Sequence, residues 1–133
     1  MNTLKSRLSL GLLVLILTSL ACGGSFSTAN ISNAYTTANP DGGSPTTVFA
    51  ADQVFYLVVE LANAPDDTVV KAVWYGVGDT PSVLDYVIDE VEITGSDSIV
   101  FNLTTDVLWP VGPYKVEVYL NGELNQTINF EVR

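Results

Sequence analysis

The sequence predicts an all-β domain, a single antiparallel sandwich of about seven short strands. Segments of six to ten residues, rich in β-branched and aromatic side chains, alternate between apolar and polar positions. Clusters of Gly, Pro, Asn and Asp separate these segments. After residue 28 no stretch keeps a helical period over three turns. Short strands divided by turns in this way are typical of antiparallel sandwiches.

The expected strands cover most of the chain after residue 28. In the second of them both faces are largely apolar, which indicates a central strand of a sheet. Residues 46–49 are interpreted as a short continuation of the first strand, beyond a loop formed by the breaker cluster at residues 39–45. The seven strands are expected at residues 29–37, 53–61, 69–77, 86–94, 98–103, 114–120 and 123–132.

The last two strands meet at an Asn-Gly pair, residues 121–122, and the turn there decides which side chains reach the core. A two-residue turn pairs Leu120 with Glu123 and sets apolar positions of one strand against polar positions of the next. A three-residue loop that ends in a left-handed glycine pairs Val118 with Leu124 instead. Because a one-residue slip turns every side chain to the other face, we predict the bulged loop. It places on the core face Leu124, Ile128, Phe130 and Val132.

The first 21 residues have the pattern of a secretory signal peptide. Lys5 and Arg7 give a positively charged start, an apolar run of 14 residues ends at Ala21, and Cys22 follows directly. A spanning helix needs roughly 20 apolar residues, so this run is too short for a transmembrane anchor. We therefore expect export across a membrane, with residues 1–21 removed.

The residues around the expected cleavage site, Thr-Ser-Leu-Ala-Cys at 18–22, resemble the lipobox of bacterial lipoproteins. In that family the cysteine is acylated on sulfur and becomes the new N-terminus. Ala21 and Cys22 fit the pattern, whereas Ser19 stands where the family usually has a leucine. The alternative is that Cys22 is a small residue in an ordinary secretory cleavage region. Lipidation accounts for a single cysteine in an exported chain, since this cysteine has no partner for an internal disulfide.

The resemblance implies a domain that is attached to a membrane through lipidated Cys22. The mature chain would start at Cys22, continue through a short flexible tether at residues 22–28 and fold as one sandwich at residues 29–133. Two or more acyl chains hold a protein stably on a bilayer. The expected location is the cell membrane or the outer membrane, with the domain facing the periplasm or the exterior.

Charge and histidine content exclude several function classes. All 15 acidic residues but only three of the five basic residues follow Cys22, which gives the mature chain a net charge of −12. This balance argues against binding to nucleic acid or to an anionic membrane surface. The sequence has no histidine, the usual general base at neutral pH. Adjacent carboxylates such as Asp89 and Glu90 point to opposite faces of a strand, so they form no catalytic pair. We expect no enzymatic activity.

Two features resemble immunoglobulin-like sandwiches, including fibronectin type III domains. Trp74 lies in the third main strand, where that fold buries a tryptophan between its sheets. The sequence Gly-Pro-Tyr-Lys-Val that begins at residue 112 resembles a tyrosine corner centred on Tyr114. In antibody domains a cysteine follows two residues later, where this chain has Val116, and the partner strand offers Leu57 or Val59. The resemblance implies an immunoglobulin-like sandwich without a disulfide, with Trp74 and Tyr114 in the core.

Candidate contact residues are aromatic. Trp109 in a loop has the character of a contact hot spot, although a plug for the open end of the sandwich is the favoured interpretation. Four tyrosines form an exposed patch if an outer sheet face binds a partner, although cross-strand packing is the ordinary explanation: Tyr35, Tyr56, Tyr75 and Tyr119. Calcium takes oxygen ligands, and its candidate ligands are loop carboxylates that follow no EF-hand pattern: Asp41, Asp66, Asp67 and Asp79.

These observations favour a non-enzymatic binding or adhesion module of the cell envelope that contacts a protein or a glycan. Two alternatives remain open: a structural accessory subunit of an envelope complex, and a calcium-binding surface domain. No cofactor is expected apart from that calcium. The chain ends on a strand, and its edge is a candidate for pairing with a second copy.

Overall fold

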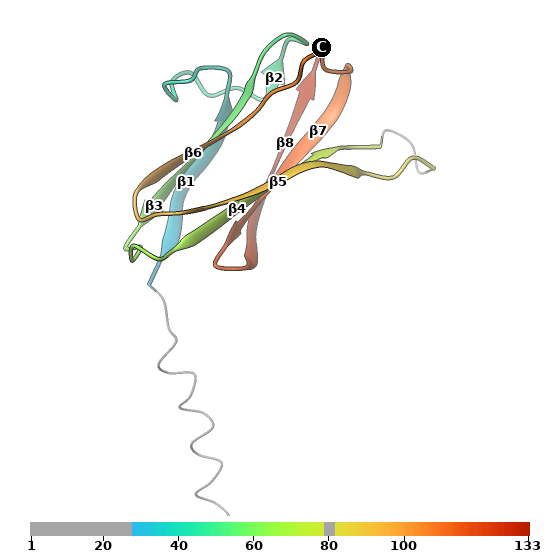
Figure 1. Cartoon of the computed structure of the whole chain (residues 1–133). Helices are drawn as coiled ribbons and strands as arrows, with labels where there is room; N and C mark the ends of the chain where they lie inside the picture. The colour runs from blue at the N-terminus through green and yellow to red at the C-terminus, as the bar shows by residue number, and fades with distance from the viewer. Residues whose placement is uncertain (1–27, 79–81) are drawn as a thin grey trace, which may run out of the picture.

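The predicted all-β immunoglobulin-like sandwich is confirmed by a computed structural model, which describes residues 28–78 and 82–133 (Figure 1). Two sheets pack face to face, with strand orders β1-β3-β6 and β2-β8-β7-β4-β5. Within the described ranges no helix is long and apolar enough to cross a membrane. The strands are β1 (Asn30–Thr37), β2 (Val48–Phe49), β3 (Phe55–Ala62), β4 (Val69–Gly76), β5 (Tyr86–Thr94), β6 (Ser98–Leu103), β7 (Gly112–Leu120) and β8 (Glu123–Val132).

The core lies between the sheets and is dominated by aromatic rings. Phe55 on β3 is at its centre, stacked on Trp109 with 4.5 Å between ring centroids and in edge contact with Phe130 at 4.9 Å. Phe49 and Tyr114 also meet Phe55 edge to face. Aromatic pairs of this kind contribute about 0.5–1.5 kcal/mol each beyond the area that they bury. The rings therefore tie both sheets together at one end of the sandwich.

The residues that carry the resemblance to immunoglobulin-like domains lie in this core. Trp74 is fully buried on β4. The Tyr114 hydroxyl donates a hydrogen bond to the carbonyl of Pro110 at 2.6 Å, the contact that defines a tyrosine corner. The positions that would hold a disulfide in antibody domains are filled by apolar side chains that are completely buried: Leu57, Val59 and Val116.

The predicted register of the last hairpin is wrong at its tip. Asn121 and Gly122 both have positive φ, 49° and 89°, and form a two-residue turn that pairs Leu120 with Glu123. This turn type requires positive φ at both positions, and Asn-Gly is the pair that adopts it most readily. The preference of Asn-Gly for a two-residue turn therefore decides the pairing here, and the alternation of apolar side chains does not.

A bulge further along the strands restores the phase. Tyr119 pairs with Leu124 but Val118 pairs with Gln126, so Asn125 is an extra residue on β8. Beyond the bulge the expected residues of β8 reach the core, because Phe130 is 5% exposed. Before the bulge they do not: Leu124 is 53% exposed rather than on the core face. The sheet thus has both the favoured turn and a buried C-terminal half of β8.

Residues 46–49 do not continue the first strand. After β1 the chain crosses to the other sheet, where β2 pairs in parallel with the end of β8. The amide of Glu131 donates to the carbonyl of Thr47 at 2.9 Å, and the amide of Arg133 donates to the carbonyl of Phe49 at 3.0 Å. The crossing places the Phe49 ring, 1% exposed, between the two sheets.

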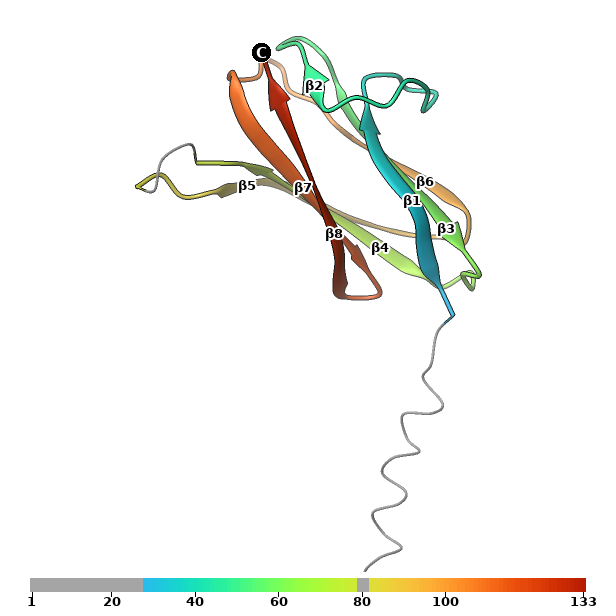
Figure 2. The ribbon, with the colours of Figure 1, turned by 180° about the vertical axis from the view of Figure 1, so that it is seen from behind.

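The two ends of the sandwich carry different connections. β1 begins at the end that holds the β3–β4, β5–β6 and β7–β8 turns (Figure 2). The β1–β2 and β6–β7 loops and the C-terminus lie at the opposite end. The described chain therefore enters the sandwich at the end farthest from these loops.

Candidate functional site

The outer face of the five-stranded sheet carries a connected group of tyrosine, lysine and glutamate side chains. It consists of Lys71 and Tyr75 on β4 and Lys115, Glu117 and Tyr119 on β7, and we call it the tyrosine–lysine face. Successive residues of a strand point to opposite faces. Since the even-numbered residues of both strands enter the core, these odd-numbered residues point outward.

Each lysine lies over the tyrosine directly opposite it on the neighbouring strand. Lys71 pairs with Tyr119, and its Nζ is 4.4 Å from the ring centroid. Lys115 pairs with Tyr75, and its Nζ is 4.8 Å from that centroid. An ammonium group over an aromatic ring contributes about 0.5–1 kcal/mol at an exposed site. The two pairs are arranged head to tail, with the lysine on β4 in one and on β7 in the other.

Glu117 connects the two pairs. Its Oε1 accepts hydrogen bonds from the Tyr75 hydroxyl at 3.0 Å and from the Tyr119 hydroxyl at 2.9 Å. Its Oε2 is 3.8 Å from the Nζ of Lys115. On β4 the residue opposite Glu117 is Val73, which is only 4% exposed although it lies on the outer face. The network therefore covers this part of the sheet.

Two further carboxylates from the β4–β5 hairpin complete the network. Asp85 is 3.0 Å from the Nζ of Lys115 and also accepts the amide of Gly78 at 3.0 Å. Glu90 is 3.7 Å from the Nζ of Lys71. The hairpin is therefore tied to β7 through Lys115.

The contacts shift the pKa values of the face in consistent directions. Partial burial, followed by the hydrogen bond to Glu117, raises the pKa of Tyr75 to about 12. The same carboxylate is the main cause of a raised pKa at Tyr119. The hydrogen bond between Lys115 and Asp85 raises the pKa of the lysine and lowers that of the carboxyl. At neutral pH Tyr75 and Tyr119 are therefore neutral donors, and Lys115 and Asp85 are charged.

The composition of the face stands out within a very acidic chain. Lys71 and Lys115 are the only lysines after Lys5, and both belong to it. Their side chains are 25% and 22% exposed. The groups offer hydroxyls, ammonium groups and carboxylate oxygens in fixed positions, which suits the recognition of a polar partner surface. Recognition by prearranged groups loses less side-chain entropy on binding.

Of the candidate contact residues, Tyr75 and Tyr119 belong to this face, whereas Tyr35 and Tyr56 lie on the other sheet and Trp109 lies in the β6–β7 loop. Tyr75 and Tyr119 are half-buried within the network. Trp109 is 7% exposed, stacks on Phe55 and donates its indole N–H to the carbonyl of Gln53 at 2.9 Å. Trp109 therefore closes the end of the core and is not an exposed contact residue, which corrects its assignment as a candidate hot spot.

The candidate calcium ligands are not gathered at one place. Asp41 lies in the β1–β2 loop and caps the amide of Gly43 at 3.1 Å. Asp66 and Asp67 lie in the β3–β4 turn at the opposite end of the sandwich (Figure 1). Asp79 lies outside the described residues. Among the residues that are described, no group of three or more His, Cys, Asp or Glu side chains is placed to hold a metal ion.

The lipidation site also lies outside the described residues, since Ala21 and Cys22 precede residue 28. Sequence reasoning found the two tyrosines of the face but missed Lys71, Lys115 and Glu117. A signal was present: all three occupy outward positions of two strands whose alternate positions are strongly apolar. Their convergence depends on the pairing of β4 with β7, which are distant in sequence.

Comparisons with known proteins support the fold. No family model and no curated protein matches the chain. An immunoglobulin-like protein of Pseudomonas aeruginosa is similar in structure, with a TM-score of 0.55 and 17% identity over 82% of this chain and 99% of the other. Part of an alkylpurine DNA glycosylase of Pseudomonas fluorescens also matches, with a TM-score of 0.51 and 20% identity. That match covers 80% of this chain but 31% of the glycosylase. At these identities the likeness concerns the fold alone.

Proposed function

We propose that this protein is an exported, lipid-anchored binding module of the cell envelope, which holds a protein or glycan partner on the tyrosine–lysine face. The observation that carries the proposal is the position of Glu117, whose one oxygen accepts both tyrosine hydroxyls while its other oxygen faces Lys115. These contacts fix the positions of two hydroxyl groups and one ammonium group on the outer face of the sheet. A prearranged polar surface is what recognition requires.

The anchor follows from the leader and from Cys22. A lipid at this cysteine would attach the domain at the end where β1 begins. Seven residues, 22–28, span at most about 25 Å when fully extended. The sheet faces would then stand clear of the bilayer, and the partner would be a molecule of the envelope within that reach.

The charge of the chain restricts the partner. With 15 acidic residues, the module repels nucleic acid and anionic membrane surfaces. Within the face, each lysine is already compensated by a nearby carboxylate. The preferred partner is therefore a neutral glycan or a neutral to basic protein surface. The described groups offer binding chemistry rather than a nucleophile with its base, so the proposed role is non-enzymatic.

The anchor is tested by the mass of the N-terminal peptide from membrane-extracted protein. The expected peptide starts at Cys22 and carries acyl chains. An unmodified peptide, or one that starts elsewhere, overturns the anchored part of the proposal.

The binding face is tested by retention of envelope proteins and glycans on the full-length protein. The double variant Tyr75→Ala/Tyr119→Ala removes both rings and both hydroxyls from the face. Tyr56→Ala is the matched control, because Tyr56 lies on β3 between inward-facing neighbours and so belongs to the outer face of the other sheet. We expect the double variant to lose retained partners and Tyr56→Ala to keep them. Equal retention by all three proteins would refute a role for this face.

A further inference from the structure

The two edges of the five-stranded sheet are protected very differently. β5 forms one edge and carries three carboxylates within four residues, at Asp89, Glu90 and Glu92. Charged side chains and bulges on an edge strand prevent it from pairing with other strands, and β5 also has a bulge in its pairing with β4. β8 lies at the other side of the sheet, and its residues 124–130 carry no charge.

Only the last part of β8 is covered. β2 pairs with Glu131 and Val132 and accepts the amides of Glu131 and Arg133. Amides two residues apart on a strand point the same way, so those of Thr127 and Asn129 point to the same open side. Within the described chain no strand pairs with residues 124–130 of β8 on this side. Thr127 and Asn129 are both exposed.

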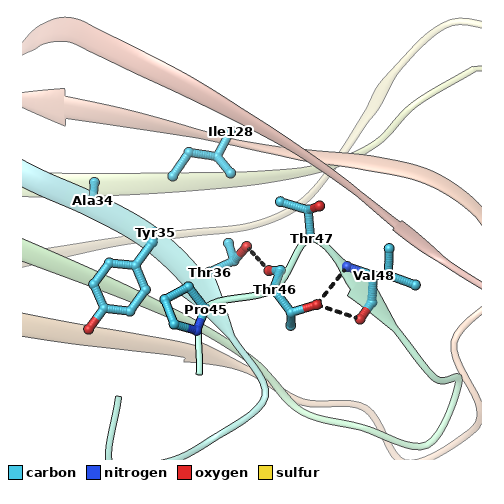
Figure 3. Close-up of a pocket in the computed structure, with 8 residues that line it drawn as sticks. All are labelled: Ala34, Tyr35, Thr36, Pro45, Thr46, Thr47, Val48 and Ile128. Atoms are coloured by element: carbon cyan, nitrogen blue, oxygen red, sulfur yellow. Dashed lines mark hydrogen bonds between the residues drawn. The ribbon is translucent and has the colours of Figure 1, made fainter. Parts of the chain in front are cut away.

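A groove lies between β1 and residues 45–48 and reaches this open edge at Ile128 (Figure 3). Its volume is about 490 Å³, within the range of ligand pockets. Ala34 on β1 and Ile128 on β8 stand on its two sides, and both pack partly against the core. The residues that line it are uncharged: Ala34, Tyr35, Thr36, Pro45, Thr46, Thr47, Val48 and Ile128.

We propose that the open edge of β8 and this groove form a second binding site, which takes an extended peptide of a partner protein as an added strand in line with β2. The main chain of the peptide would bond to the amides and carbonyls of Thr127 and Asn129. Its alternate side chains would enter the groove between Ala34 and Ile128, where apolar β-branched residues fit. Strand addition of this kind takes its affinity from the main chain and its specificity from alternate side chains.

The acidic charge of this chain favours basic residues on both sides of the bound peptide segment. It also argues against a second copy of the chain as the occupant. The uncharged stretch of β8 is preceded by Glu123, which is exposed, and the mature chain carries a net charge of −12. Basic residues on both flanks of a partner peptide are therefore attracted. Two copies of this chain repel each other, and in each copy β2 blocks the end of the same edge. The site is separate from the tyrosine–lysine face and does not depend on it.

Residue-resolved amide exchange with a synthetic peptide tests the proposal. The probe is Lys-Lys-Thr-Val-Thr-Val-Thr-Val-Lys-Lys, added to the full mature protein in neutral detergent. The matched control is the same peptide with N-methylated valines, which keeps the side chains and the charge but removes main-chain donors. At a peptide concentration ten times its Kd, exchange at Thr127 and Asn129 should slow about tenfold, because only the free fraction exchanges. The methylated peptide should leave both amides unchanged.

Protein variants give a second reading of the same site. Thr127→Pro removes one edge donor that bonds to nothing in the described chain, and Thr127→Ala keeps that donor while it removes the side chain. We expect Thr127→Pro to weaken peptide binding by up to about tenfold, the loss of one hydrogen bond, and Thr127→Ala to leave binding unchanged. Tyr56→Ala, on the outer face of the other sheet and outside the groove, should bind the peptide normally.

Four results overturn the proposal. The first is unchanged exchange at about 1 mM peptide, a concentration that detects even weak complexes. The second is protection on β5 or on the tyrosine–lysine face instead of β8. The third is equal binding of the methylated peptide. The fourth is protection of Thr127 and Asn129 that rises with protein concentration alone, which would identify a second copy as the occupant. If Thr127→Pro does not fold, the comparison of the unmethylated and methylated peptides still tests the proposal.

Discussion

β4 and β7 present two faces made from alternate residues of the same two strands, and the two are stabilised in different ways. On the inner face Trp74, Val116 and Val118 are fully buried. On the outer face Tyr75 and Glu117 are half-buried and act through directed hydrogen bonds. Burial depends on area and packing, whereas hydrogen bonds and ion pairs depend on direction and charge. Changes to the inner face should therefore alter folding, and changes to the outer face should alter titration and binding.

The largest effect is expected from Phe55→Ala. The Phe55 side chain is fully buried and contacts five other rings, so its removal leaves a cavity where the two sheets meet. Truncation of a buried phenylalanine costs about 3–5 kcal/mol. Urea unfolding followed by tryptophan fluorescence measures this loss. Tyr56→Ala, one residue along the strand on the other face, should cost much less. Similar losses for both variants would contradict the division between faces.

Tyr114→Phe gives a smaller loss on the inner face. It keeps the ring stacked on Phe130 but removes the hydrogen bond to the carbonyl of Pro110. The loss of one such bond costs about 1 kcal/mol. The expected decrease in Tm is about 4–8 °C for a domain of this size. An unchanged Tm would show that the bond of the tyrosine corner adds nothing to stability here.

The tyrosines of the outer face should make stability depend on pH in the alkaline range. The pKa of Tyr75 is about 12 in the folded chain, above the ordinary value of 10.0. A raised pKa means that the folded state keeps a proton that the unfolded state loses. The stabilisation from Tyr75 is therefore complete below about pH 10 and is lost as the pH rises to about 12. Tyr114, Tyr119 and Lys115 have raised pKa values and act in the same direction.

Glu117→Gln separates the causes of this shift. The substitution removes the negative charge, and the amide oxygen of glutamine can still accept hydrogen bonds from both tyrosines. The pKa of Tyr75 should fall yet stay above 10, because partial burial is the larger cause. Absorbance at the tyrosinate band, with Tyr75→Phe to assign the signal, follows the change. A pKa that does not move would exclude Glu117 as a contributor.

The positions of strands and of the inner face were predictable from the sequence because both depend on local alternation. Ile99, Phe101 and Leu103 of β6 alternate in sequence and are all buried. What failed depended on distant or compensating features. The register near Asn125 required a bulge that offsets the phase of the turn, and β2 required a partner more than 80 residues later. Strand pairing that distant in sequence leaves no periodic signal in either segment.

Only the tyrosines of the tyrosine–lysine face could be predicted from the sequence, because the rest of the face depends on strand pairing. Tyr75 and Tyr119 are evident from the sequence as outward aromatic positions. Glu117 has no distinctive motif, and its role exists only because the β4–β7 register brings Tyr75 within 3.0 Å of it. Asp85 reaches Lys115 through the β4–β5 hairpin in the same way. Side-chain networks across strands need the register before they can be recognised.

The smallest effect is expected from Lys71→Met, which tests whether the outer face contributes to folding at all. Methionine keeps most of the apolar stem over the Tyr119 ring but removes the ammonium group and its contact with Glu90. An exposed pair of this kind contributes about 0–1 kcal/mol and is screened by salt. The urea midpoint should fall slightly at low ionic strength and match the wild type in high salt. A large loss that persists in salt would mean that the contact of the ammonium group with the Tyr119 ring supports the sheet, and the outer face would then contribute to folding.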